Sequence, residues 1–257
     1  MKTLLEIQKV TKDFGGLRAI NELDLDVCQG EILGVIGPNG AGKTTLFSVI
    51  SGFLQPTGGR VMFRGEDITG LKPHAIAQKG IVRTFQLMTL WADFSVMNNI
   101  QLALHMKSGL GFFGALLNTP PARRKERQVD KRAMEILRFV GMDHLKDQVA
   151  RTLSHGYQRT LSLAIGMASG PPLLLLDEPV TALSPERVNN ILDLVKQLRE
   201  QGSTVMIIEH NMRAIFDVCD RIAVINYGNK IAEGAPSQIK DDPVVTSAYL
   251  GVKKGVT

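Results

Sequence analysis

The sequence is poor in cysteine, in aromatic residues and in long hydrophobic runs. Cys28 and Cys219 are its two cysteines, and they form neither a CxxC pair nor a metal-ligand spacing, which argues against a disulfide scaffold or a structural zinc site. Aromatic residues make up 5% of the chain, few for a protein that binds single-stranded nucleic acid by base stacking. Its aliphatic runs reach only the four leucines from Leu173 to Leu176, whereas a membrane-spanning helix needs about 20 apolar residues.

The chain also lacks a strong charge imbalance and a targeting signal. Thirty lysines and arginines against 25 acidic residues give a net charge of +5, which suits an anionic ligand, a membrane surface or nucleic acid without selecting among them. The first ten residues contain no apolar core or cleavage site of a signal peptide. With 44% hydrophobic residues in 257, the sequence predicts a soluble, cytosolic protein of one large or two closely joined globular domains.

Apolar periodicity predicts an α/β core interrupted by a helical insertion. Short apolar or alternating stretches separated by helical patterns are typical of a largely parallel sheet covered on both faces. The expected strands are 3–10, 17–27, 31–36, 61–65, 81–85, 173–177, 203–210, 221–225 and 230–234, and the expected core helices are 43–53 and 185–201. We expect segments 1–86 and 171–235 to form the core, 87–170 a helical subdomain and 236–257 a helical tail.

The insertion combines one clear helix with a stretch of irregular composition. Its expected helix has apolar residues at helical spacing on one face, namely Val129, Ala133, Ile136, Leu137 and Val140. Residues 105–128 are expected to be irregular, and the basic run 123–127 to be a solvated face, with a nucleic-acid or lipid-headgroup patch as the alternative. Residues 109–114 spell G-x-G-x-x-G outside any βαβ unit, so we interpret them as a flexible loop.

Residues 37–44 match the phosphate-binding pattern G-x-x-x-x-G-K-[ST] in full, after an expected strand and before an expected helix. Glycines let backbone N–H groups approach phosphate oxygens, and the helix N-terminus favours an anion. Lys43 would reach the β- and γ-phosphates, and the Thr44 hydroxyl would ligate Mg²⁺. The expected nucleotide-binding residues here are Gly37, Pro38, Asn39, Gly40, Ala41, Gly42, Lys43, Thr44 and Thr45.

Two carboxylates and a histidine follow later strands. Asp177, at the end of its strand, suits Mg²⁺ coordination through water, and Glu178 suits polarising a water for attack on the γ-phosphate. His210 ends the strand expected at 203–210 and would contact either the γ-phosphate region or Glu178. A GTPase would carry N-K-x-D, which residues 229–232 do not complete. A small-molecule kinase usually lacks an Asp-Glu pair followed by a histidine at strand ends, and both classes are therefore disfavoured.

Together these motifs resemble those of the ABC-type ATPases over nearly the whole chain. GPNGAGKTT at 37–45, RTFQ ending at Gln86, LSHGYQ at 153–158, LLLLDEP at 173–179 and IIEHNM around His210 occur in the order and spacing of that family. The resemblance implies a P-loop NTPase fold of the RecA-like class. It would have a mostly parallel sheet, an N-terminal antiparallel β part and an inserted helical subdomain. The resemblance also implies ATP and Mg²⁺ as cofactors.

The resemblance further assigns roles to residues outside the phosphate-binding loop. Gln86 is expected to act in catalysis and at the metal together with Asp177, beside the catalytic Glu178 and His210, and Phe14 is expected to stack on adenine. In the family two ATPase domains pack head to tail, which implies that Ser154 and the Gly156 N–H bind the γ-phosphate across that interface.

Ser154 also suits a helix N-cap, a reading that is compatible with a phosphate contact. Tyr157 stands where the family usually has Gln, and Ser184 where many members have Asp. Ser184 likewise suits an N-cap, with Pro185 in the first helical position. The sequence therefore does not predict whether this chain makes the contacts that the family makes through these two positions.

Finer features resemble the ATP-binding subunits of branched-chain amino-acid importers, the LivG-like type. These features are GLRAI, GIVRTFQ, LLNTPPARRKE and SAYLG. The resemblance implies ATP-driven solute import with two membrane permease subunits, a second ATPase subunit that is a paralogue or a second copy, and indirectly a solute-binding protein. It implies no nucleic-acid partner and a peripheral position on the cytoplasmic face of the inner membrane.

The expected permease contact is a groove beside Gln86, bordered by Met88, Leu90, Trp91 and Phe94. Trp91 is the expected anchor of this groove, whereas Phe94 and Met97 are expected in the core of the insertion. The alternatives are the ATPase of a urea, amide or lipopolysaccharide transporter, or a soluble ABC ATPase of translation or DNA repair. The latter usually has two fused ATPase halves or a long coiled-coil insertion.

Overall fold

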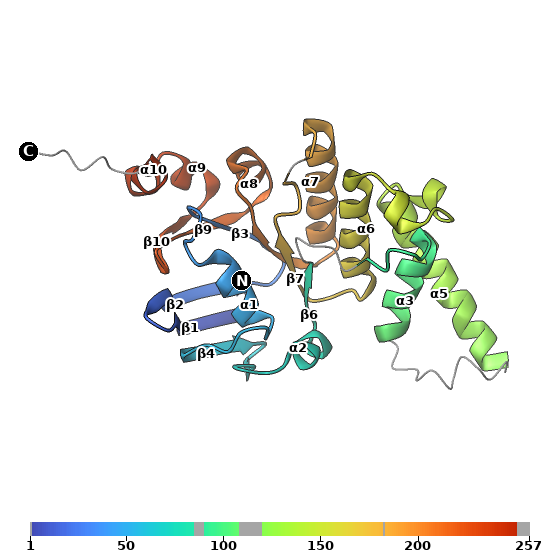
Figure 1. The fold of residues 1–257 in the computed structure, drawn as a ribbon, viewed down its shortest axis with the longest axis horizontal. Helices are drawn as coiled ribbons and strands as arrows, with labels where there is room; N and C mark the ends of the chain where they lie inside the picture. The colour runs from blue at the N-terminus through green and yellow to red at the C-terminus, as the bar shows by residue number, and fades with distance from the viewer. Residues whose placement is uncertain (1, 85–89, 108–119, 182, 251–257) are drawn as a thin grey trace, which may run out of the picture. The chain divides into compact units, whose positions relative to one another are not determined.

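The computed structural model describes residues 2–84, 90–107, 120–181 and 183–250. Its contacts divide the chain into two compact units, one formed by Met1–Arg83 with Pro172–Thr257 and the other by Thr84–Pro171. The first unit contains β-sheets with covering helices, and the second is helical (Figure 1).

The described residues form two β-sheets. The antiparallel sheet has the strand order β2-β1-β4-β5, and the larger sheet has the order β10-β9-β3-β8-β7-β6. In the larger sheet β3 pairs in parallel with β8 and β9, β7 pairs in parallel with β8, and β10 is antiparallel to β9. The strands are β1 (Thr3–Phe14), β2 (Leu17–Cys28), β3 (Ile32–Ile36), β4 (Gly58–Phe63), β5 (Glu66–Asp67), β6 (Ile81–Thr84), β7 (Leu173–Asp177), β8 (Thr204–Ile208), β9 (Arg221–Asn226) and β10 (Asn229–Gly234).

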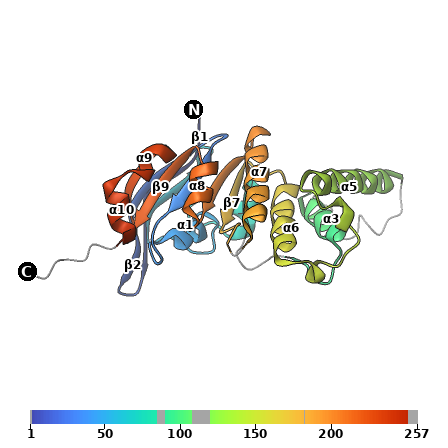
Figure 2. The same cartoon turned by 90° about the horizontal axis from the view of Figure 1, so that it is seen from above.

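The hydrophobic core of this unit is built around α1 (Lys43–Ile50). Leu46, Phe47 and Ile50 of this helix are fully buried in one cluster with residues of both sheets. Every residue of β3, β7 and β8 is buried, as expected for strands covered on both faces. The other helices of the unit are α2 (Pro73–Lys79), α7 (Pro185–Glu200), α8 (Met212–Val218), α9 (Pro236–Lys240) and α10 (Pro243–Leu250). Figure 2 shows α9 and α10 beside the β9–β10 hairpin.

Parallel pairing gives β3, β7 and β8 the same direction, so their carboxyl ends meet at one edge of the sheet. The loop that follows β3 leads into α1, and the segments after Asp177 and Ile208 begin at the same edge. Three sequence-distant segments are therefore brought to one place by strand order alone.

The described part of the second unit contains α3 (Val96–Lys107), α5 (Pro120–Phe139) and α6 (His155–Ala168), with short 3₁₀ turns at Asp143–Leu145 and Ala150–Thr152. The three helices contact one another. The apolar face predicted for this helix is confirmed, because the four predicted residues on α5 and Val140, which directly follows the helix, are all less than 9% exposed. This amphipathic stripe is what packs the helix against its neighbours.

The α/β fold with an antiparallel part and a helical insertion is confirmed, and several local expectations are wrong. The stretch 105–128, expected to be irregular, is helical at both ends, since α3 continues to Lys107 and α5 begins at Pro120. The basic run therefore lies on α5, where Arg124 and Arg127 are exposed as expected for a solvated face, while residues 109–114 lie outside the described residues. Helix α1 ends at Ile50 because Gly52 adopts a φ of 76°, and a Cβ there would lie 2.3 Å from the Leu71 carbonyl oxygen.

Two predictions about single residues also fail. Strand β8 ends at Ile208, so His210 lies in the following loop and not in the strand. Phe94, expected in the core, is 46% exposed, and Met97 is half-buried. Among the described residues, we find no helix with the length and apolar character needed to cross a membrane.

Candidate active site

The loop between β3 and α1 has a backbone that only glycine accommodates at two positions. Gly37 has a φ of 153°, and a Cβ there would lie 1.9 Å from the Ile225 carbonyl oxygen. Gly42, the N-cap of α1, has a φ of 107°, and its Cβ would lie 2.4 Å from the Ala19 carbonyl oxygen. The loop is therefore packed tightly between β2 and β9, with its shape fixed before any ligand binds.

The C-terminal part of the chain also contacts this loop. In the turn between β9 and β10, the Gly228 N–H donates to the Ala41 carbonyl at 2.9 Å, and the Gly228 carbonyl accepts from the Asn21 N–H at 2.9 Å. In α10, burial raises the pKa of Tyr249 to about 12, while a hydrogen bond with the Gly37 backbone partly opposes this shift. The loop is thus supported by β2, the β9–β10 turn and α10.

Lys43 is held inside the loop. Its side chain is buried, and its ammonium donates hydrogen bonds to the carbonyl oxygens of Gly37 at 2.7 Å and Pro38 at 2.9 Å. Burial lowers the pKa of Lys43, although the nearby carboxylates of Glu178 and Asp177 partly oppose this shift. A phosphate group in the loop would restore the stability of the charged form.

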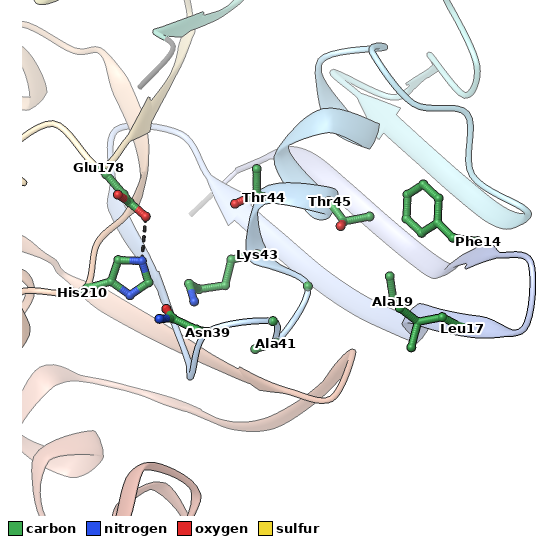
Figure 3. Close-up of a pocket in the computed structure, with 12 residues that line it drawn as sticks. Phe14, Leu17, Ala19, Asn39, Ala41, Lys43, Thr44, Thr45, Glu178 and His210 are labelled. Atoms are coloured by element: carbon green, nitrogen blue, oxygen red, sulfur yellow. Dashed lines mark hydrogen bonds and ion pairs between the residues drawn. The ribbon is translucent and has the colours of Figure 1, made fainter. Parts of the chain in front are cut away.

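A pocket extends from this loop to β1 and β2 on one side and to the ends of β7 and β8 on the other. Phe14 and Leu17 lie at one end, the Glu178–His210 pair at the other, and Lys43 between them (Figure 3). The other lining residues are Ala19, Asn39, Gly40, Ala41, Gly42, Thr44 and Thr45. The predicted loop residues from Asn39 to Thr45 therefore share one pocket, to which the structure adds Leu17 and Ala19.

Phe14 presents an exposed aromatic surface at its end of the pocket. Its side chain is 44% exposed, and the Lys12 ammonium lies 5.0 Å from the ring centroid. An exposed ring in a pocket offers a flat apolar face to a planar ligand. A nucleobase bound there would have its phosphates directed toward Lys43, as the order of residues along the pocket requires (Figure 3).

Glu178 and His210 are in direct contact. The Glu178 Oε1 and His210 Nε2 atoms are 2.6 Å apart, so of the two partners expected for His210 the structure brings it to Glu178. The Glu178 N–H donates to the Ile208 carbonyl at 2.9 Å, and the residue has a φ of 51°. A non-glycine residue in this region costs about 1–3 kcal/mol, and such strain is concentrated at functional sites.

Glu209, which the motif analysis missed, connects the loops after β7 and β8. Its carboxylate is 1% exposed and accepts hydrogen bonds from the N–H groups of Val180 at 2.8 Å, His210 at 3.1 Å and Asn211 at 3.4 Å. Burial raises the pKa of Glu209, and the three N–H donors partly oppose that shift. The signal in the sequence was a charge directly after an apolar strand, but its partners depend on the tertiary structure.

The donor set fits a magnesium ion that arrives with a nucleotide. Asp177 is 5% exposed at the end of β7, and Thr44 is in the first turn of α1 and lines the pocket. Within the part of the chain that the structure describes, no group of three or more His, Cys, Asp or Glu side chains is placed to hold a metal. Magnesium is commonly bound through one carboxylate and substrate phosphates, which matches this oxygen-only set.

Some expected site residues lie elsewhere. Gln86 and Met88 fall within 85–89, outside the described residues. Ser154 and Gly156 begin α6 in the second unit, where Ser154 occupies the N-cap position but its hydroxyl makes no capping hydrogen bond. Ser184 is likewise at the N-cap of α7, before Pro185, without a side-chain cap. Both serines therefore occupy the expected N-cap positions, but neither hydroxyl forms the capping hydrogen bond.

Gln158 does not replace the glutamine missing at position 157. Its side chain is buried, and its Nε2 donates to the Ala150 carbonyl at 3.4 Å within the second unit. Tyr157 is half-buried, with its ring edge-on to His144 at a centroid distance of 6.2 Å. The departure at 157 is therefore accommodated by local packing.

Comparison with known proteins now adds to this geometry. The sequence profile of the ABC transporter family matches residues 20–181, and that of the branched-chain amino acid ATP-binding cassette transporter matches residues 229–254. The chain is 41% identical to the high-affinity branched-chain amino acid transport ATP-binding protein BraF of Pseudomonas aeruginosa, over 97% of this chain and 98% of the relative. It is 39% identical to LivG of Escherichia coli strain K12, over 96% and 98% of the two chains.

Solved structures agree with this result. A nucleotide-free ATP-binding cassette of an ABC transporter superposes with a TM-score of 0.84 at 32% identity, over 97% of this chain and 99% of that one. An ATP-binding cassette in its ADP conformation superposes with a TM-score of 0.85 at 31% identity, over 98% and 100%. The chain therefore belongs to the ABC transporter family of ATP-binding subunits and is an ATPase.

Proposed function

We propose that this protein is the ATP-hydrolysing subunit of an importer for branched-chain amino acids. The observation that carries the substrate class is the full-length identity of 41% with BraF, against 32% with the lipopolysaccharide export protein LptB of Haemophilus influenzae. The separate match of residues 229–254 to a branched-chain amino acid transporter profile supports the same class. These residues include β10, α9 and α10, so the support comes from a part of the sequence separate from residues 37–45.

In the proposed mechanism the pocket holds ATP along its length. Phe14 stacks on the adenine, and the backbone of residues 37–42 with Lys43, Thr44 and Thr45 binds the phosphates. Thr44 and Asp177, together with the phosphates, would hold Mg²⁺, which would supply neutralisation of the phosphate charge. Gln86, next to β6 in the sequence, is assigned to the same metal and to catalysis.

Glu178 is the proposed residue that orients the attacking water. Its carboxylate lies at the pocket wall beyond Lys43, where a γ-phosphate would end, and His210 is 2.6 Å from it (Figure 3). The imidazole holds the carboxylate in place and offers its ring to the γ-phosphate region. The His210 backbone N–H donates a hydrogen bond to the Glu209 carboxylate, which fixes the backbone from which the imidazole extends into the pocket.

We propose further that two ATPase subunits, identical or paralogous, work head to tail. Ser154 and the Gly156 N–H at the start of α6 would then bind the γ-phosphate held by the other subunit. Ser154 is exposed and its hydroxyl makes no capping hydrogen bond, so the hydroxyl is available for such a contact.

The proposed division into domains has three parts. Residues 1–86 and 171–235 bind ATP, residues 87–170 form the signature subdomain, and residues 236–257 form a tail.

The proposed partners are two membrane permease subunits and, through them, a solute-binding protein. Trp91 and the exposed Phe94, near the start of the second unit, are the proposed contacts of a permease helix. The protein would accordingly be peripheral, on the cytoplasmic face of the cell membrane, and would not bind nucleic acid.

The test is purification of the tagged chain from its native cells in mild detergent, with a tag-only strain as the control. We expect two polytopic membrane proteins to co-purify with the chain, with or without a second ATPase. The complex is then reconstituted, and solute-binding proteins are tested for stimulation of its ATPase activity. Stimulation by a leucine-loaded protein supports the substrate class, whereas stimulation only by a urea- or amide-loaded protein contradicts it. Ribosomes or DNA in place of membrane proteins would contradict a role in transport.

A further inference from the structure

Arg83 is a buried cation that the roles assigned above do not use. It lies in β6, and its side chain is 6% exposed. Burying a guanidinium is costly unless charged and polar partners surround it. The groups that contact the Arg83 guanidinium therefore indicate the role of its positive charge.

The guanidinium joins the end of β7 to α1. Its Nη2 atom donates to Asp177 Oδ2 at 2.6 Å, and both side chains of this ion pair are no more than 6% exposed. Its Nη1 atom donates to the hydroxyls of Ser48 at 3.0 Å and Ser51 at 3.4 Å. Ser48 lies in the second half of α1 and Ser51 is its C-cap residue, so Arg83 is anchored both to β7 and to the end of α1.

Asp177 is thus neutralised by a group of the protein itself. A buried carboxylate without a counter-charge would attract divalent cations from solution, because the low local dielectric strengthens that attraction. Lys43, the other cation near Asp177, is engaged with the carbonyls of Gly37 and Pro38. Among the described residues, Arg83 is therefore the cation in hydrogen-bond contact with Asp177.

We propose that Arg83 is the resident counter-cation of Asp177 and makes metal binding conditional on nucleotide. With Arg83 on Oδ2, the carboxylate alone does not bind Mg²⁺, and the metal gains this site only with the negative charge of the phosphates. Arg83 is a positioning residue in this scheme, since it acts through Asp177. The inference rests on the proposed function, in which Asp177 serves the metal.

The test replaces Arg83 by methionine, which removes the charge and keeps a long side chain. In nucleotide-free buffer we expect the Arg83→Met variant to melt about 10 °C below wild type, because one partner of a buried pair is left alone. Millimolar Mg²⁺ should raise the melting temperature of this variant by several degrees through binding at Asp177. Nucleotide-free wild type should show no such rise.

Two controls separate this effect from a general loss of packing. Arg60→Met makes the same change at an exposed position of β4 and should cause neither the fall nor the response to Mg²⁺. Arg83→Met combined with Asp177→Asn removes both charges, so it should melt above the single variant and ignore Mg²⁺. An unchanged melting temperature in Arg83→Met, or no response of that variant to Mg²⁺, overturns the proposal.

A second measurement applies even when Arg83→Met does not fold. Titration of wild type with Mn²⁺, followed by electron paramagnetic resonance, should show tight binding only when ATP is present; equal affinity without ATP overturns the proposal. The underlying assignment is tested separately by Asp177→Asn, which should lose the Mg²⁺ dependence of ATP affinity. If that dependence survives, the proposed role of Asp177 fails, whereas failure of the Arg83 experiments alone leaves that role intact.

Discussion

At the scale of single residues, two adjacent carboxylates have contrasting surroundings. Asp177 is buried against the Arg83 guanidinium, whereas Glu178 reaches the pocket wall and contacts His210. The φ of 51° at Glu178 separates the two, because the chain turns out of β7 at that residue. Metal binding and water activation can thus be served by neighbours in sequence whose side chains lie in different environments.

The first residue-scale prediction concerns Glu178→Gln. Turnover should fall by about 10²–10⁴-fold because the amide is no longer a base, while ATP affinity should stay near wild type because shape is retained. Phosphate release and calorimetry measure the two quantities. Glu186→Gln, an exposed change in the first turn of α7, is the matched control. Near-normal turnover in Glu178→Gln would show that another group orients the water.

The second residue-scale prediction concerns the charge on Lys43. Burial lowers its pKa, and bound phosphates favour the ammonium, so ATP binding raises that pKa. As pH rises through the lowered value, the free protein loses this proton, ATP affinity declines, and binding becomes coupled to proton uptake. Calorimetry in two buffers of different ionisation enthalpy measures the uptake. Lys43→Ala should bind ATP weakly and take up no such proton; equal uptake in both proteins contradicts the assignment.

At the scale of elements, the loops after β7 and β8 act as one unit because Glu209 bonds to both. Glu209→Gln keeps the size of the side chain but replaces an acceptor oxygen by a donor group that faces N–H donors. We expect a loss of stability of about 1–3 kcal/mol and a fall in turnover larger than the change in ATP affinity. Denaturant unfolding and steady-state kinetics test this. Glu200→Gln, exposed at the end of α7, should leave both unchanged.

Helix α5 offers a stability prediction confined to the second unit. Ile136→Ala removes buried volume from its apolar face and should cost about 2–5 kcal/mol. Arg132→Ala, on the exposed face where Arg132 pairs with Glu135 at 3.1 Å, should cost less than about 1 kcal/mol. Hydrogen exchange should show the loss of protection in residues 96–107 and 120–168. Equal effects of the two changes would contradict the packing of the helix.

Local patterns predicted these elements well where the chain itself sets the geometry. The phosphate-binding loop, the β7 carboxylates and the α5 stripe follow from contiguous residues. The partner of His210 could not be chosen from sequence, because it depends on β7 and β8 being neighbours in the sheet. Arg83 and Glu209 were missed for the same reason, and Phe94 was misplaced because apolar character does not by itself determine burial.

At the scale of the whole molecule, the site in one chain lacks the γ-phosphate contact that the proposed dimer would supply. In the Glu178→Gln background ATP should therefore convert monomer to dimer, as measured by sedimentation. Adding Ser154→Asp should prevent this, because its carboxylate repels the phosphate, while aspartate is as favourable as serine at the N-cap position of α6. Ser154→Asn, which suits the same position but carries no charge, is the control. Dimers that form equally in all three variants would place the interface elsewhere.

The turn at Gly228 has a consequence for anyone who wishes to re-engineer the protein. It bonds to Ala41 in the phosphate-binding loop and to Asn21 in β2, and the chain then continues into residues 229–254, which match the specialised transporter profile. A tail from another transporter could be exchanged only downstream of this turn. A graft made before it would remove the backbone that braces the loop, and the chimera would lose its nucleotide site together with its old tail.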